Sequence, residues 1–226
     1  MKLSKRLSAI DALVSQHQNI IWDCCCDHGY LGMVFLKRDA ASKVIFVDII
    51  TRVMVDLEAQ LTRNNKFRLK SNKKPDWQVL CQDVGTIELT EIEKQVVVIA
   101  GIGGELLLRL VQQIISNNSI ERVQHVRFIL CPVHHTYSLR SGLKKLGLGL
   151  VSEQIVYDNK RFYEVIEVSF NTNNEISSTG KKMWDFTQAE HGLYQRQLLS
   201  HYNKMLNKDE PYYQKVITDY QALTDS

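Results

Sequence analysis

A short apolar run that ends in an acidic loop, residues 20–30, constrains the fold of this chain more than any other stretch. Ile20-Ile21-Trp22 leads into Asp23, three cysteines follow, and DHGY (27–30) opens a helical pattern. This order predicts a strand, a tight loop and a helix. In open α/β sheets such a loop lies at the carboxyl end of a strand, where ligands bind. Gly29 can adopt the positive φ that a tight loop needs.

The same alternation of apolar run and amphipathic helix continues along the chain. Strands are expected at 43–48, 77–81, 95–100 and 126–131, and helices at 3–14, 29–37, 51–64, 105–116 and within 134–146. Runs that are apolar throughout fit parallel strands covered on both faces. Residues 151–156 and 162–170 flank a turn at 157–160 and predict an antiparallel hairpin. The pattern predicts an α/β fold with a doubly wound sheet.

The composition changes after this hairpin and indicates a second unit. Residues 171–180, NTNNEISSTG, form a polar linker without an apolar period. Thr187 to Glu190 fits a capping box at the start of a helix, and Pro211 suits the first turn of another. Apolar residues at helical spacing then predict an αα-hairpin. We therefore expect domains at 1–170 and 181–226.

Size and charge exclude several classes of protein. With 226 residues, 44% hydrophobic content and a net charge of +3, the chain is expected to form a globular protein with one main core. No apolar run is long enough to span a bilayer, and the basic start lacks the apolar segment of a secretory signal. Five cysteines, three of them consecutive, fit reduced cytoplasmic thiols. His134-His135 lacks a second pair of ligands, so no metal site is expected.

Four predicted strand ends would meet at one edge of the sheet. They are the loop Asp23–His28, Asp48, Asp83 and the segment Ala100–Gly104. An acid after the second strand commonly holds a ribose diol, in sites for NAD and for S-adenosylmethionine alike. A dinucleotide site would have G-x-G-x-x-G in the first loop, whereas this loop has two acids and one glycine. Those acids would repel a pyrophosphate and attract a sulfonium and an ammonium, which favours S-adenosylmethionine.

Four motifs together resemble a known family. LSKRL (3–7), DCCCDHGYL (23–31), VDI (47–49) and IAGIGG (99–104) are similar to the bacterial tRNA adenine-N1 methyltransferases that act on the adenine at position 22, the TrmK family. The resemblance covers about residues 1–170 in order, and the helical hairpin is similar to that family's C-terminal appendage. It implies a seven-stranded, Rossmann-like methyltransferase sheet with S-adenosylmethionine bound at the strand ends.

Roles for individual residues follow from this resemblance. Asp48 would bind the ribose hydroxyls, and Asp83 would accept from the adenine amino group of the cofactor. Asp27 would stabilise the cation formed on the target base, and Tyr30 or His28 could stack on that base or pack at the helix start. The predicted catalytic residues are Asp27 and Tyr30, and the predicted cofactor-binding residues are Asp23, Cys24, Cys25, His28, Gly29, Asp48, Ile49, Asp83, Val84, Ala100, Gly101 and Gly103.

A basic segment is the expected contact for tRNA. Residues 63–74 contain no acid, and their cations could displace counterions from phosphates or belong to a solvated loop. Lys5 and Arg6 could contact RNA in the same way or lie on a solvated helix face. The predicted tRNA contacts are Lys66, Arg68, Lys70, Lys73 and Lys74, with Lys5 and Arg6 as further candidates.

Two other functions stay open on the sequence. The family tends to have Q-P-N after the fifth strand, where this chain has Cys131-Pro132-Val133 and so no polar side chain for a base edge. That difference favours an RNA-binding module without turnover. An NAD-dependent oxidoreductase is the third alternative. Tight binding of S-adenosylhomocysteine, or of NADH, would separate the two cofactor classes because a ligand stabilises the fold that binds it.

Overall fold

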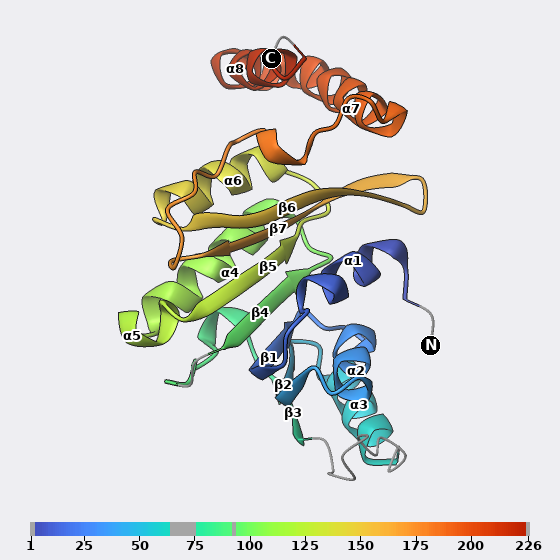
Figure 1. Ribbon diagram of the computed structural model, residues 1–226, viewed down its shortest axis with the longest axis vertical. Helices are drawn as coiled ribbons and strands as arrows, with labels where there is room; N and C mark the ends of the chain where they lie inside the picture. Colours follow the sequence, from blue (N-terminus) through green and yellow to red (C-terminus); the bar gives the residue numbers. More distant parts are fainter. Residues whose placement is uncertain (1–2, 64–75, 92–93, 225–226) are drawn as a thin grey trace.

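One seven-stranded sheet, in the order β3-β2-β1-β4-β5-β7-β6, organises the protein in the computed structural model, which describes residues 3–63, 76–91 and 94–224 (Figure 1). Strands β1 to β5 pair in parallel, and β7 runs antiparallel to both β5 and β6. The strands are β1 (Gln18–Cys24), β2 (Ala41–Asp48), β3 (Asp76–Cys81), β4 (Gln95–Ala100), β5 (Val126–Cys131), β6 (Gly149–Asp158) and β7 (Arg161–Ser169). The predicted doubly wound sheet is confirmed.

Helices cover both faces of the sheet and make two separate cores. One core joins α1, α2 and α3 to side chains such as Ile21 and Phe46, and the other joins α4, α5 and α6 to side chains such as Trp22 and Ile45. Neighbouring residues of one strand thus enter opposite cores, as pleated strands require. The covering helices are α1 (Lys5–Leu13), α2 (Tyr30–Lys37), α3 (Thr51–Arg63), α4 (Gly104–Asn117), α5 (Ile120–Val123) and α6 (Thr136–Lys145).

The antiparallel hairpin β6–β7 closes one edge of the sheet, as predicted. Its turn consists of Asn159 and Lys160, which both have positive φ, 50° and 62°. Two consecutive positive φ values are the signature of the hairpin turns that match strand twist. The turn brings Asp158, at the end of β6, beside the start of α1, so the first helix lies against the hairpin (Figure 1).

The polar linker packs against the sheet. Ile176 and Thr179 are buried, and Asn174 exchanges hydrogen bonds with Leu150 of β6, with its carbonyl accepting from the Leu150 N–H at 2.8 Å. After the linker come the short 3-10 helix η2 (Lys181–Met183) and the helices α7 (Ala189–Met205) and α8 (Glu210–Gln221). They pack on α6 through a third cluster that includes Tyr137, Val216 and Tyr220.

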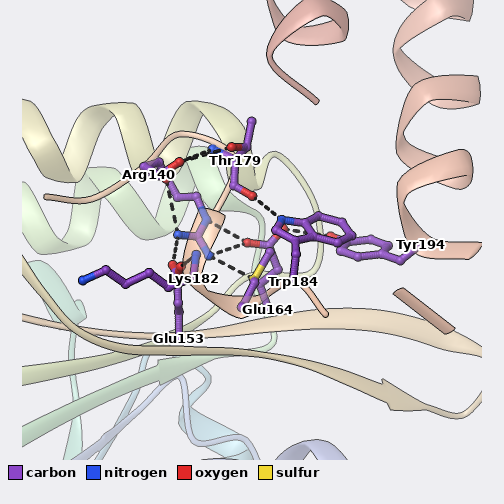
Figure 2. Close-up of polar contacts among 9 residues, drawn as sticks. Arg140, Glu153, Glu164, Thr179, Lys182, Trp184 and Tyr194 are labelled. Atoms are coloured by element: carbon purple, nitrogen blue, oxygen red, sulfur yellow. Dashed lines mark hydrogen bonds and ion pairs between the residues drawn. The ribbon is translucent and has the colours of Figure 1, made fainter. Parts of the chain in front are cut away.

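A buried arginine ties these parts together (Figure 2). Arg140 of α6 has no exposed surface, and its guanidinium donates to Glu164 of β7 at 2.7 Å and to Glu153 of β6 at 2.5 Å. Tyr194 of α7 donates to the other oxygen of Glu164 at 2.9 Å, and the Lys182 N–H donates to Glu153 at 2.8 Å. One cluster therefore joins the sheet edge, the linker and the C-terminal helices.

One local expectation is corrected and another is confirmed. The capping box at Thr187 is wrong: α7 begins at Ala189 with Gln188 as its N-cap, and no side chain caps it. The Asp185 carboxylate instead accepts hydrogen bonds from the Thr187 hydroxyl at 2.6 Å and from the Gln188 side-chain amide at 2.8 Å. Pro211 does lie in the first turn of α8, after the N-cap Asp209. Within the described ranges, no helix has the length and apolarity to cross a membrane.

Candidate active site

Strand register aligns the four predicted strand ends in one row. Cys24 of β1 pairs with Val47 of β2 and Ile99 of β4, and the next residues of β2 and β4 pair with the last residues of β3 and β5. The loops that leave these strands therefore start at the same level. They border a cavity of about 660 Å³. Of the predicted site residues, the cavity is lined by Asp23, Cys24, Cys25, Asp27, His28, Tyr30, Asp48, Ile49, Asp83, Val84, Ala100 and Gly101.

Asp48, at the end of β2, both shapes the site and faces it. Its Oδ2 accepts from the Asp27 N–H at 3.1 Å, and its Oδ1 accepts from the Ile50 N–H at 3.1 Å. The carboxylate thus holds the β1–α2 loop and the β2–α3 turn together. Each oxygen keeps a second lone pair for a ligand, as a diol-binding acid requires.

Asp23, at the end of β1, is buried beneath the loop. Its Oδ2 accepts from the Gly32 N–H at 2.8 Å. A Cβ at position 32 would lie 2.8 Å from that oxygen and 2.2 Å from the Phe46 ring, so only glycine allows this approach. Burial raises the pKa of Asp23 to about 7, the charge of Asp48 adds to the rise, and the Gly32 amide opposes it. The carboxyl is therefore poised to respond to a cation in the cavity.

The loop between β1 and α2 has an unusual backbone. Cys25 and Asp27 have positive φ of 52° and 49°, and Gly29 has a φ of 66° as the N-cap of α2. Such conformations cluster at ligand-binding turns. Burial, with the charges of Asp48 and Asp23, raises the pKa of the Cys25 thiol to about 12. The thiol is therefore neutral at physiological pH, so the side chain lines the cavity and does not act as a nucleophile.

The end of β3 forms the second side of the cavity. Asp83 caps the 3-10 helix η1 (Val84–Thr86), with its Oδ1 accepting from the Gly85 N–H at 2.8 Å. Val84 is buried below, while Ile49 is exposed on the same cavity. An acceptor between two branched apolar side chains fits a flat aromatic ring that carries an amino group.

Backbone hydrogen bonds join the ends of β4 and β5, which form the third side of the cavity. Gly101 has a φ of 86° and its N–H donates to the Cys131 carbonyl at 3.1 Å. The Val133 N–H donates to the Ile102 carbonyl at 2.9 Å, and Gly103 packs on the His134 ring. The apolar segment after β5 therefore supports the β4 end through its backbone. Gly103 and Gly29 shape the loops, but neither lines the cavity.

The two predicted catalytic residues lie at the open side of the cavity. The side chain of Asp27 is 70% exposed, and its Oδ1 is 3.7 Å from Nε2 of His28. The rings of His28 and Tyr30 are 5.8 Å apart and tilted. A carboxylate and two rings at the rim are free to meet a second, larger substrate.

Several cavity residues were not predicted as cofactor contacts. Cys26, Leu31, Ile50 and Gln82 adjoin predicted positions in the sequence, so a wider window around each strand end would have included them. Leu7 and Ile102 lie within the quoted motifs, but Leu106, Arg109 and Leu110 of α4 carry no local signal.

The predicted RNA contacts divide into three groups. Arg6 lines the cavity, whereas Lys5 is exposed and does not. The basic residues Lys66, Arg68, Lys70, Lys73 and Lys74 lie outside the described residues.

Known proteins share this fold. A family profile described as "Methyltransferase domain" matches residues 3–166. MG248 of Mycoplasma genitalium, named as a candidate tRNA methyltransferase, is 23% identical over 98% of this chain and 94% of its own length. The structure of M. capricolum TrmK with S-adenosylhomocysteine has a TM-score of 0.75 at 18% identity, over 100% of this chain and 99% of that chain. The B. subtilis m1A22 tRNA methyltransferase TrmK has a TM-score of 0.69 at 21% identity, over 99% and 95%. The strand order with a reversed β7 is the class I methyltransferase fold.

Proposed function

The chain belongs to the methyltransferase domain family, and on that premise we propose that it methylates N1 of adenine 22 in tRNA with S-adenosylmethionine as donor. The observation that carries the proposal is the row of carboxylates around one cavity, Asp23, Asp48 and Asp83, in a first loop and strand ends without a phosphate-binding motif. Full-length similarity to TrmK structures supports the choice of tRNA as substrate.

The cavity fits the proposed donor in size and charge. About 660 Å³ lies within the range of small-molecule sites. When bound, the donor supplies an electrophilic methyl group on a sulfonium. Asp48 would accept the ribose hydroxyl protons, Asp83 the adenine amino group, and Asp23 would lie beneath the positive amino-acid end. The walls in contact with the donor would be formed by Cys24, Cys25, Ile49, Val84, Ala100 and Gly101. His28 would lie at the open side, and Gly29 and Gly103 would determine the loop conformations.

The residues at the open side suit a base that has left its stack. Adenine N1 already carries a lone pair, so the protein has to align the base more than to deprotonate it. Tyr30 or His28 would stack on the extruded base. Asp27 would accept from its amino group and stabilise the positive charge that forms on the ring. Val133, after β5, is apolar and contributes its backbone N–H, which donates to the Ile102 carbonyl.

The proposed partner is tRNA in the cytoplasm, held by cations of this chain. The basic residues Lys66, Arg68, Lys70, Lys73 and Lys74 would contact its phosphates, with Lys5 and Arg6 as further candidates.

A transfer assay tests the activity directly. The full chain is incubated with S-adenosylmethionine carrying a labelled methyl group and with a bacterial tRNA that has adenine at position 22, or guanine there as the control. We expect label in the first tRNA only, as 1-methyladenosine in the nucleoside digest. Label in both tRNAs would contradict the proposed position.

A second function, a binding module without turnover, is favoured by one observation. Val133, which follows β5, is apolar and has no polar side chain for a base edge. Binding of both tRNA and S-adenosylhomocysteine without any transfer would support the module. Stabilisation by NADH and none by S-adenosylhomocysteine would overturn both functions.

A further inference from the structure

A second cavity lies beside the first at the same edge of the sheet. Its volume is about 190 Å³, and its walls come from the segment after β5, the start of β7 and helix α7. Because β7 runs antiparallel to β5, its start lies at the edge where β5 ends, which is also the edge of the active-site cavity. The second cavity therefore lies between the sheet and the C-terminal helices.

A thin wall separates the two cavities. The Val133 N–H donates to the Ile102 carbonyl at 2.9 Å, and Ile102 lines the first cavity while Val133 lines the second. Tyr163 lines the second cavity as well, and its ring centre is 4.8 Å from the guanidinium carbon of Arg6, which lines the first. A large substrate that enters the first cavity from its open side therefore passes close to the second.

Aromatic and imidazole rings from three elements line the second cavity. They are His134 and His135 after β5, Phe162 and Tyr163 of β7, and His201 and Tyr202 of α7. RNA-binding proteins stack unpaired bases on side chains of these types. The volume lies below the range of about 300–1,000 Å³ that larger ligands need. This lining and size suit a single flat base.

The charges of the lining are compatible with a nucleic acid. Glu164 is the acid among the described residues of this cavity, and its two oxygens accept from Arg140 at 2.7 Å and from Tyr194 at 2.9 Å. It is buried, so it presents no free carboxylate to a phosphate. Nδ1 of His135 lies 3.2 Å from Oε1 of Glu105. Throughout the part of the chain that the structure describes, no three His, Cys, Asp or Glu side chains could hold a metal ion, so the histidines offer rings.

Resting on the proposed function, we propose that the second cavity binds the base of a nucleotide adjacent to the target adenine in the tRNA. The target base has to leave its stack to reach the donor, which costs free energy. A neighbouring base that stacks on the rings of the second cavity offsets part of this cost. It also keeps the strand open while the adenine lies in the first cavity.

Helix α7 offers a matched pair of positions for a test. Leu198 lines the second cavity and is half-buried, whereas Leu193 is 40% exposed and does not line it. Leu198→Trp would fill the cavity, and Leu193→Trp adds the same bulk to the same helix outside it. His201→Trp is a second filling variant, at an exposed position where the fold tolerates a larger side chain.

Binding of intact and abasic tRNA to the full chain tests the proposal. Two tRNAs lack the base either before or after adenine 22. Filter binding should show that the unaltered chain loses about ten- to hundredfold in affinity for one of them, as for the loss of one stacked base. Leu198→Trp and His201→Trp should bind intact tRNA that much more weakly and no longer distinguish it from the abasic tRNA. Such a cycle isolates the contact between base and cavity.

The control and the cofactor complete the expected result. Leu193→Trp should bind intact tRNA within twofold of the unaltered chain and keep the loss caused by the missing base. Affinity for S-adenosylhomocysteine, measured by calorimetry, should stay within twofold in all three variants. Thermal melting shows which variants are folded, and His201→Trp carries the test if Leu198→Trp does not fold.

Three outcomes would overturn the assignment. Methylation of intact tRNA, with equal affinity of the unaltered chain for intact and abasic tRNA, would show that no adjacent base is bound. A loss for the abasic tRNA that persists in the filled variants would place that base elsewhere on the protein. Both outcomes leave the proposed function intact. Absence of methyl transfer from the unaltered chain to intact tRNA would remove the proposed function and this assignment with it.

Discussion

Carboxylates at this site serve the fold and the ligand at once. Asp48 accepts two backbone N–H groups and still lines the cavity, and Asp23 accepts one while burial raises its pKa to about 7. Substitutions at these positions therefore have separable effects. Loss of the charge alters ligand affinity, and loss of the acceptor alters the loop.

The first prediction concerns Asp48. Asp48→Ala should lower the affinity for S-adenosylhomocysteine at least tenfold, because the two ribose hydroxyls lose a charged acceptor. The affinity for tRNA should stay within twofold. Calorimetry and filter binding measure the two ligands. Asp48→Asn keeps one acceptor oxygen, so its affinity for S-adenosylhomocysteine should lie between those of the unaltered protein and Asp48→Ala. Equal losses for cofactor and tRNA would mean that the two sites are misplaced.

The second prediction is a pH dependence that originates at Asp23. In the free protein part of this buried carboxyl stays protonated up to about pH 7. A cationic donor favours the carboxylate, so binding releases a proton, and affinity for S-adenosylmethionine should rise with pH and level off above about pH 7. The slope is at most tenfold per pH unit. Calorimetric titrations between about pH 5.5 and pH 8.5 measure it.

Asp23→Asn should flatten this profile, because the titrating group is gone. His28→Asn is the control, since its imidazole lies on the same loop and lines the same cavity. A rise that survives in Asp23→Asn and disappears in His28→Asn would assign the pH dependence to the histidine.

At the level of elements, most of the parallel strands were predictable because they contain apolar runs that alternate with amphipathic helices. The ends of parallel strands share one edge, so the four acidic or glycine-rich segments could be placed together from sequence alone. The β4 and β5 limits agree with the predicted ones at 95–100 and 126–131. Strand edges were less predictable: Cys81 closes the apolar run 77–81, yet it ends the edge strand β3 and is exposed.

Contacts between distant segments could not be predicted from one sequence. Arg6 meets Tyr163 only because the hairpin β6–β7 lies beside α1, and Arg140 meets two glutamates through the same hairpin. Neither contact has a local signal. The capping box failed for a local reason, because the Thr187 hydroxyl donates to the Asp185 carboxylate at 2.6 Å instead of capping the helix.

The third prediction belongs to the basic segment after α3. Reversal of charge at Lys70, Lys73 and Lys74 should weaken tRNA binding and reduce the dependence of affinity on salt, because fewer counterions are released. Affinity for S-adenosylhomocysteine should not change. Filter binding at several salt concentrations measures the slope. Reversal of the same number of charges at Lys204, Lys208 and Lys215, in the C-terminal helices and their junction, is a control for net charge.

For the whole molecule, the C-terminal helices depend on a buried charge cluster. We propose that residues 1–170 form the cofactor unit and that residues 181–226 form a helical unit docked on it. Arg140 and Tyr194 meet at Glu164, and Tyr137 of α6 donates to Asp219 of α8 at 2.6 Å. These contacts connect the two units across their interface.

The fourth prediction concerns that cluster. Arg140→Met should lower the free energy of unfolding by about 3–5 kcal/mol, because Glu153 and Glu164 are left as buried carboxylates without their cation. Tyr194→Phe, which removes one hydrogen bond to Glu164, should cost about 1–3 kcal/mol. Urea unfolding at neutral pH measures both. A smaller cost for Arg140→Met than for Tyr194→Phe would show that water enters the cluster and solvates the glutamates.

The anchoring of α1 by Asp158 has a bearing on synthesis at the ribosome. Chains emerge from their amino terminus, yet the first helix finds its anchor only when the last two strands have been made. A nascent chain that stops before residue 158 would display the carboxylate row without the anchored α1, which contributes Arg6 and Leu7 to the cavity wall. Donor capture should therefore begin late in translation, only after the hairpin β6–β7 has left the exit tunnel.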